Sequence, residues 1–239
     1  MKKDKLDVAI LGATGMVGQR MVALLEPHPW FNVNFVGASP KSVGKSYAQA
    51  TPWRLEANIP NAVAELVVNE CSPDQLPPGI AVVFSALDSA VAGEVESQFR
   101  DAGYIVISNA GAHRMAEDVP LIIPEVNPQH LLHGRRPDGG TIITNPNCCA
   151  IPLTLSLAPL EERWGIEAVV VSTWQAVSGA GYPGESAWDM VGNVHPHAGN
   201  EEQKIAQEPG KILGRSFPIS ARCVRVPVPD GHLLSVQVR

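Results

Sequence analysis

Three glycines near the N-terminus, Gly12, Gly15 and Gly18, constrain the fold of this chain more than any other feature. They follow the apolar run 6–11 and precede residues 16–25, whose apolar positions have helical spacing. Glycines let the backbone turn sharply and approach a pyrophosphate, and the N-terminus of the following helix supplies N–H donors. The spacing therefore predicts a dinucleotide-binding loop between the first strand and first helix of a Rossmann-type domain.

The residues after the second predicted strand bear on the choice of dinucleotide. An NAD-selective site usually has Asp or Glu about 20 residues after the loop, at the ribose 2′-hydroxyl. Residues 36–42 contain no carboxylate, and Lys41, with Lys45 beyond it, could bind a 2′-phosphate. This favours NADP over NAD; the alternative is a solvated loop. The positions expected to contact the cofactor are Gly12, Thr14, Gly15, Met16, Val17, Gly18, Ser39, Lys41 and Ser42.

Strand-like and helix-like segments alternate in the first part of the chain. Continuous apolar runs predict strands at 6–11, 32–36, 62–68, 80–86, 105–108 and 141–144, with helices at 16–25 and 91–102. This alternation predicts an α/β fold with a parallel sheet covered on both faces.

The pattern changes near residue 147. A helix is expected over 148–160 and another over 200–213, with strands at 168–176, 223–228 and 233–238 and a glycine-rich loop at 179–184. We therefore expect a dinucleotide-binding domain over 1–147 and an α+β domain, with a mixed or antiparallel sheet, over 148–239.

Composition excludes several classes of protein. The 239 residues are 45% hydrophobic, enough for a sizeable core, and the net charge of −6 argues against a nucleic-acid partner. No apolar run reaches the roughly 18 residues of a membrane helix, so we expect no membrane partner. The N-terminal apolar run is too short for a signal peptide, and four cysteines without Cys-x-x-Cys spacing suggest a reduced protein. A cytoplasmic location is expected.

A cysteine follows Asn145-Pro146-Asn147, where a strand ends and a helix is expected to begin. A thiol at a helix N-terminus is shifted toward thiolate, which is the nucleophile of aldehyde oxidation and acyl transfer. Cys148 is therefore the candidate nucleophile. Cys149 lies one residue deeper, and a buried helical cysteine is the alternative for either residue.

Several segments together resemble a known family. They are Gly12–Gly18, Ser108–Met115, Val119–Asn127, Asn145–Cys148, Gln175–Gly184 and Arg225–His232. The chain is similar to the aspartate-β-semialdehyde dehydrogenases of archaea, fungi and some bacteria over nearly its whole length. It departs from them at Cys149-Ala150, where the family usually has Ser-Thr, and at Gly111, where Ser is expected.

The resemblance implies reductive dephosphorylation of β-aspartyl phosphate to aspartate β-semialdehyde with NADPH, through a thioacyl-enzyme, in lysine, threonine and methionine biosynthesis. It implies that Cys148 is the nucleophile, His232 the general acid/base and Gln175 the group that orients the acyl carbon. The implied substrate contacts are Arg225 to the α-carboxylate, Glu201 to the amino group, Lys204 and Arg114 to phosphate, and Asn109. Ser85 and Ala86 resemble cofactor-contacting positions.

Ordinary structural roles compete with each of these assignments: a turn histidine, an inward strand glutamine, a surface ion pair or a solvated arginine. Two other functions compete as well. A malonyl-CoA reductase would share the scaffold, but Glu201 suits an amino-bearing substrate instead. A non-catalytic nucleotide-binding fragment is the third possibility.

The family implies a homodimer or homotetramer. We expect no metal, because His195 and His197 have no evident third ligand. Family members usually continue well beyond the equivalent of His232, so a C-terminally truncated chain is expected.

Overall fold

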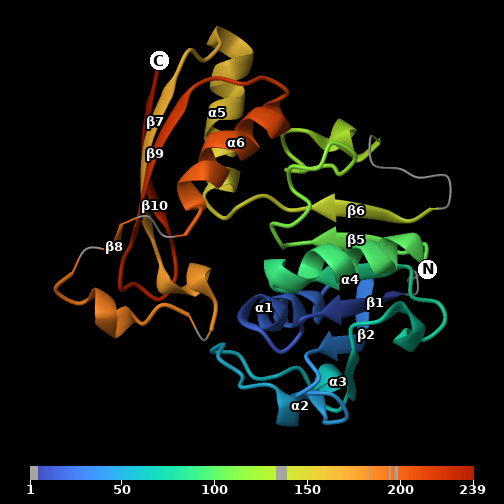
Figure 1. The fold of residues 1–239 in the computed structure, drawn as a ribbon. Helices are drawn as coiled ribbons and strands as arrows, with labels where there is room; N and C mark the ends of the chain where they lie inside the picture. Colours follow the sequence, from blue (N-terminus) through green and yellow to red (C-terminus); the bar gives the residue numbers. More distant parts are fainter. Residues whose placement is uncertain (1–4, 133–138, 183, 194, 197–198) are drawn as a thin grey trace. The chain divides into compact units, whose positions relative to one another are not determined.

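The structure, a computed structural model, describes residues 5–132, 139–182, 184–193, 195–196 and 199–239 (Figure 1). The chain divides into two units, Met1–Pro120 with Leu132–Thr144, and Leu121–Leu131 with Asn145–Arg239. The second division lies near the boundary predicted at residue 147. Residues 121–131 precede that boundary and nevertheless belong to the second unit.

The first unit contains a parallel six-stranded sheet in the order β3-β2-β1-β4-β5-β6. Its strands are β1 (Leu6–Leu11), β2 (Phe31–Ala38), β3 (Val68–Glu70), β4 (Val82–Ser85), β5 (Ile105–Ser108) and β6 (Thr141–Thr144). Its helices are α1 (Met16–Leu25), α2 (Tyr47–Ala50), α3 (Asn61–Ala64) and α4 (Ser89–Asp101). This is the strand order of a dinucleotide-binding fold, and the parallel sheet confirms the predicted Rossmann-type domain.

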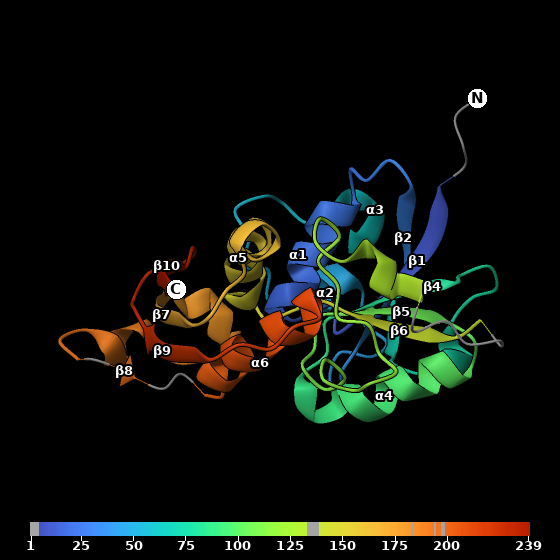
Figure 2. The same ribbon diagram turned by 90° about the horizontal axis from the view of Figure 1, so that it is seen from above.

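The central strand β1 explains why both faces of this sheet are covered. Val8 and Ile10 point to one side and pack with Val22 of α1. Ala9 and Leu11 point to the other side and pack with Phe99 of α4. Figure 2 shows the two helices on opposite sides of the sheet. Because successive side chains in a strand alternate, an uninterrupted apolar run is what a strand buried on both faces requires.

The strand predicted over 62–68 is wrong. Residues 61–64 form the short helix α3, and strand pairing begins only at Val68. Pro60 directly precedes the helix, and its carbonyl accepts hydrogen bonds from the N–H groups of Val63 and Ala64. Val63 is buried there by the helical turn. A short apolar run fits a helical turn as well as a strand, so periodicity alone could not separate them.

The second unit contains a four-stranded mixed sheet in the order β10-β7-β9-β8. β7 pairs in parallel with β9 and antiparallel to β10, so of the two predicted arrangements, mixed or antiparallel, the sheet has the mixed one. Its elements are α5 (Ala150–Trp164), β7 (Val169–Gln175), β8 (His195–Pro196), α6 (Glu201–Leu213), β9 (Ile219–Arg225) and β10 (Leu233–Val238), with short 3₁₀ turns at Val177–Ala180 and Ala187–Met190. A further 3₁₀ turn, Pro128–Leu132, lies where the chain passes from the second unit back to the first. Leu153 of α5 and Ile205 of α6 pack with Val171 of β7 in one core.

Two predicted elements of this unit need correction. The helix expected over 148–160 begins at Ala150 and continues to Trp164. The strand expected over 223–228 lies at 219–225 instead. Pro227 and Pro229 lack the N–H donor that a ladder needs, so pairing ends before them. Among the described residues, no helix is long and apolar enough to cross a membrane.

Candidate active site

The glycine loop of the first unit has no space for a side chain at two of its glycines, Gly12 and Gly18. A Cβ on Gly12 would lie 2.6 Å from the carbonyl oxygen of Ala86, and Gly12 has a φ of +71°. A Cβ on Gly18 would lie 2.2 Å from the carbonyl oxygen of Gly12. Gly15 directly precedes α1 as its N-cap. No side chain of the N-cap residue covers the N-terminus of α1. A dinucleotide pyrophosphate could therefore approach the backbone N–H groups there.

The other predicted cofactor positions follow neighbouring strands. Ser39 and Lys41 are exposed after β2, while Ser42 is half-buried in the same turn. Lys45 instead donates to the carbonyl of Lys41 at 3.0 Å. These positions and the glycine loop follow the carboxyl ends of the adjacent parallel strands β2 and β1, which is where such folds bind ligands.

Ser85 ends β4 on the other side of β1, with Ala86 half-buried after it. The Ser85 hydroxyl is buried and donates to Glu96 of α4 at 2.6 Å, so its side chain braces the strand end. The predicted phosphate contact of this unit, Arg114, lies beyond β5. It is buried and donates from Nη2 to the carbonyl of Asn109, a predicted substrate contact, at 2.8 Å.

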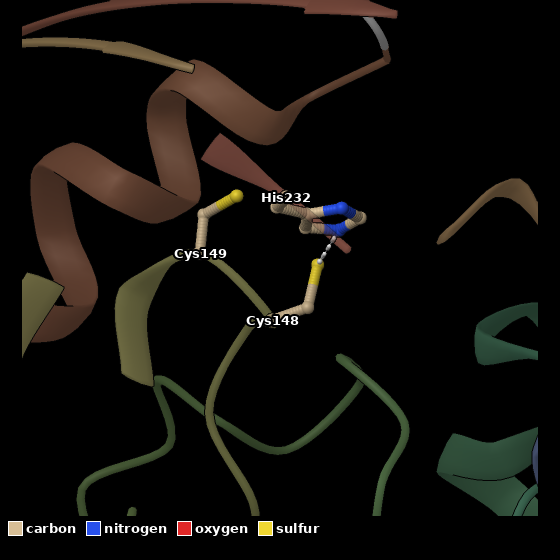
Figure 3. A group of neighbouring side chains, drawn as sticks. All are labelled: Cys148, Cys149 and His232. Carbon is tan, nitrogen blue, oxygen red and sulfur yellow. Dashed lines mark hydrogen bonds between the residues drawn. The ribbon is translucent and has the colours of Figure 1, made fainter. Parts of the chain in front are cut away.

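The candidate nucleophile lies in the second unit. Cys148 is exposed, and its Sγ is 3.2 Å from Nε2 of His232 (Figure 3). Cys148 precedes α5, while His232 directly precedes β10, so residues 84 positions apart meet. Cys149 is buried beside them, and the two sulfurs and one ring nitrogen of His232 lie within 4.8 Å of one another.

The environment of Cys148 favours thiolate. The Cys149 thiol, as a hydrogen-bond partner, has the largest effect and, together with His232, lowers the pKa of Cys148 to about 5, against the opposing effect of the partial desolvation of its sulfur. The pKa of Cys149 is raised by the same contact and by burial, so Cys149 keeps its proton. The pair therefore comprises a nucleophilic thiolate and a neutral thiol near pH 7.

The ring of His232 is held at both nitrogens. Its Nδ1 accepts the N–H of Ala176 at 3.0 Å, and its Nε2 faces the Cys148 sulfur. The hydrogen bond with Cys148 raises the pKa of His232. Distance alone would allow the three clustered atoms to bind a soft metal ion. A metal needs the Nε2 lone pair with a proton on Nδ1, however, and Nδ1 faces a donor.

Gln175 and Arg225 end the paired strands β7 and β9 and are both buried. Arg225 donates from Nη1 to Oε1 of Gln175 at 3.2 Å and to the carbonyl of Ala176 at 3.0 Å. Its Nε meets Glu185 at 3.0 Å. Within the described residues these contacts use Nε and Nη1, which leaves Nη2 for a substrate carboxylate.

Glu201 and Lys204 begin α6 and form an ion pair of 2.7 Å. Burial would raise the pKa of Glu201, but hydrogen bonds from Lys204 and Asn147 lower it below its ordinary value. The Asn147 side chain donates to Glu201 at 2.7 Å. The carboxylate is therefore ionised, and its hydrogen-bond partner Asn147 is the residue directly before Cys148.

Sequence reasoning gave no separate role to Asn147, Glu208 or Glu185. Asn147 accepts the N–H of Cys149 at 2.9 Å and donates its own N–H to Glu208 at 2.6 Å. Two signals were available: Asn commonly caps a helix, and Glu208 lies seven residues after Glu201 on one helix face. Glu185 gave no local signal, because its contact with Arg225 spans 40 residues.

The predicted residues thus fall into two sets. The second unit brings together Cys148, His232, Gln175, Arg225, Glu201 and Lys204, while the first unit holds Asn109, Arg114 and the cofactor positions. Pro183 of the glycine-rich segment and His197 lie outside the described residues. His195, to which no site role was assigned, has its Nδ1 3.5 Å from Glu185.

Two family models match the chain. Residues 7–133 match "Semialdehyde dehydrogenase, NAD binding domain", and residues 157–239 match "Semialdehyde dehydrogenase, dimerisation domain".

Proteins of known sequence and structure give the same assignment. Aspartate-semialdehyde dehydrogenases of Archaeoglobus fulgidus and Cryptococcus neoformans are each 44% identical to the chain. The matched regions cover 98% and 99% of this chain, respectively, and 71% of each relative. The crystal structure of the Candida albicans enzyme with NADP has a TM-score of 0.89 at 37% identity, over 99% of this chain and 72% of that one. A Vibrio cholerae aspartate semialdehyde dehydrogenase II has a TM-score of 0.80 at 28% identity, over 99% of this chain and 74% of that one. The chain belongs to the aspartate-semialdehyde dehydrogenase family.

Proposed function

We propose that this protein is an NADP-dependent dehydrogenase that interconverts β-aspartyl phosphate and aspartate β-semialdehyde. The contact of 3.2 Å between Cys148 and His232 carries the proposal, because it pairs a thiolate with an imidazole in a family of semialdehyde dehydrogenases. In the reductive direction Cys148 attacks the acyl phosphate, phosphate leaves, and a thioester remains on the sulfur. When bound, NADPH supplies the hydride that reduces this thioester.

The surrounding charges suit that substrate. Nη2 of Arg225 would hold the α-carboxylate, and the ionised Glu201 would hold the amino group. Lys204 and Arg114 would bind phosphate, Gln175 would position the acyl group, and Asn109 would be a further substrate contact. No contact of these residues favours a malonyl-CoA ester or a non-catalytic role. The general acid/base role of His232 remains a prediction.

NADP is the preferred cofactor because no carboxylate follows β2, where exposed Ser39 and Lys41 lie beside Ser42. The Candida albicans relative, crystallised with NADP, supports this choice. The glycine loop, with Ser85 and Ala86 at the end of β4, would hold the dinucleotide. Residues 1–147 would then form the cofactor domain, and residues 148–239 the catalytic and dimerisation domain.

A homodimer or homotetramer is proposed for the assembly. The dimerisation-domain match supports oligomerisation, and the mixed sheet carries apolar side chains on one face. Trp174 and Leu233 are 40% and 65% exposed and lie opposite each other in the β7–β10 pair. We also propose a cytoplasmic location, where lysine, threonine and methionine synthesis would proceed and a reducing environment would keep Cys148 free.

A direct assay tests the proposal. The purified chain should reduce NADP⁺ with aspartate β-semialdehyde only when phosphate is present, and less efficiently with NAD⁺. Cys148→Ala should abolish turnover while NADPH binding, measured by calorimetry, persists. Reduction of malonyl-CoA in place of aspartate β-semialdehyde oxidation, or turnover by Cys148→Ala, would contradict it.

A further inference from the structure

A carboxylate of the chain itself lies on Arg225, the residue predicted to hold the substrate carboxylate. Arg225 is buried at the end of β9, and a buried guanidinium is strongly disfavoured unless an anion faces it. Its Nε donates to Oε2 of Glu185 at 3.0 Å. Glu201 also feels the charge of Arg225, but its carboxylate is held by hydrogen bonds from Lys204 and Asn147. Glu185 is therefore the direct counter-ion of Arg225.

The hydrogen bonds of Arg225 show which part of the guanidinium is exchangeable. Nη1 donates to Oε1 of Gln175 and to the carbonyl of Ala176, which both lie at the end of β7, so this nitrogen is fixed by the sheet. A carboxylate binds a guanidinium most strongly through two parallel N–H groups. With Nη1 committed, the edge formed by Nε and Nη2 is the one that can offer both. Because Glu185 occupies Nε, a substrate carboxylate could use both N–H groups only after Glu185 has left.

Glu185 is placed so that it can leave. It lies in the segment between β7 and β8, where its side chain is 34% exposed, whereas that of Arg225 is 6% exposed. Its other oxygen, Oε1, lies 3.5 Å from Nδ1 of His195. β8 pairs with β9 so that His195 is opposite Arg225, and this Nδ1 is buried and makes no hydrogen bond with the described residues. A small movement of the Glu185 carboxylate would therefore exchange Arg225 for a neighbour that is already adjacent.

We propose that Glu185 is an internal competitor of the substrate, which holds Arg225 until the α-carboxylate of the substrate displaces it. The proposal rests on the proposed function, in which Arg225 binds that carboxylate. A substrate carboxylate can replace Glu185 because it brings the same charge and two acceptor oxygens. An uncharged aldehyde leaves Glu185 in place and gains no contact with Arg225. Glu185 is therefore a specificity-determining residue, which weakens the binding of every substrate and weakens it least for a carboxylate.

Glu185→Gln tests the competition through kinetics. The amide keeps the size of the side chain but not its charge, so it competes less well for the guanidinium. The KM for aspartate β-semialdehyde should fall by about three- to tenfold, and the change should appear in KM more than in kcat. Asp189→Asn is the matched control, since it removes an exposed carboxylate from the same segment, and it should leave KM unchanged. An unchanged KM in Glu185→Gln would overturn the proposal. A raised KM would do so as well, because it would mean that Glu185 only orients Arg225.

A binding measurement separates this proposal from the proposed reaction. L-aspartate carries the α-amino and α-carboxylate groups of the substrate and needs no turnover. Calorimetry should show that Glu185→Gln binds it about three- to tenfold more tightly than the unmodified protein does. L-isoasparagine, in which the α-carboxylate is an amide, should bind both proteins equally. Equal affinities for L-aspartate would overturn the competition even in an active dehydrogenase. Tighter binding by a variant of an inactive protein would support the competition and refute only the reaction.

Discussion

Cys148 owes its reactivity to two neighbouring side chains. The sequence suggested a helix N-terminus as the cause, yet α5 begins two residues later, at Ala150. The Cys149 thiol and the ring of His232 instead provide the hydrogen bonds that favour thiolate. Cys149 occupies a position where the family usually has serine, and here its thiol is the hydrogen-bond partner of Cys148.

Cys149→Ala should raise the pKa of Cys148 from about 5 toward the ordinary thiol range, because the largest stabilising contact of the thiolate is lost. At pH 5 the rate of alkylation by iodoacetamide should fall about fivefold for the first unit of the shift and about tenfold for each further unit, because about half of the thiol is ionised when its pKa is about 5. Cys149→Ser is the matched control, since its hydroxyl can still donate. It should shift the midpoint of the curve of alkylation rate against pH by less than Cys149→Ala does. An unchanged midpoint in Cys149→Ala would assign the whole effect to His232.

At the scale of the elements, one buried carboxylate joins α4 to the sheet. Glu96 is fully buried, and its Oε1 accepts the hydroxyls of Ser85 and Ser108, which end β4 and β5, at 2.6 and 2.7 Å. Its Oε2 lies 3.8 Å from Nε2 of His113, just before Arg114. Glu96 therefore braces two strand ends and the segment that carries a predicted phosphate ligand.

Glu96→Ala should lower the free energy of unfolding by about 3 kcal/mol or more, because two charge-assisted hydrogen bonds are lost and two buried hydroxyls lose their acceptor. Glu96→Gln keeps an acceptor oxygen and should cost less. Glu94→Ala, at an exposed position of the same helix, should change stability by less than about 0.5 kcal/mol. Urea unfolding followed by fluorescence measures all three. Equal costs for Glu96→Ala and Glu94→Ala would contradict the bracing role.

Elements whose pattern is local were predictable from the sequence. β1, α1, β5, β6 and β10 have the predicted bounds, because each is a single apolar or amphipathic run ended by turn residues. The run 62–68 failed because a few apolar residues suit either a helical turn or a strand.

The glycine loop and Cys148 were predictable from local patterns, whereas the other residues of the candidate active site were predictable only through the family resemblance. Contacts that join distant segments, such as Glu185 with Arg225 or Ala176 with His232, have no periodic signature. Backbone donors are also invisible in a sequence, since every residue except proline carries one.

For the whole molecule, the exposed face of the mixed sheet bears on assembly. Trp174 of β7 is paired with Leu233 of β10 and with Val224 of β9, so three strands contribute apolar side chains to one strip. Such a strip on a dimerisation domain is typical of a surface covered by a second copy.

Sedimentation should show a dimer or tetramer at micromolar concentration, and Trp174→Asp should shift it toward monomer, because a buried charge without a partner disfavours the interface. Trp30→Asp is the control, since Trp30 is 68% exposed in the first unit. A monomeric unmodified chain, or equal effects of the two variants, would argue against this face.

The backbone around Cys148 is held in place by residues other than the reactive cysteine. Asn147 is fixed by Glu208 on one side of the cysteine, and the N–H of Cys149 is fixed by the side chain of Asn147 on the other. Neither bond uses the Cys148 side chain, so the backbone there is positioned by its neighbours. Selenocysteine or serine at position 148 should therefore keep the same backbone position. Each variant would place a different nucleophilic atom, selenium or oxygen, in the same geometry.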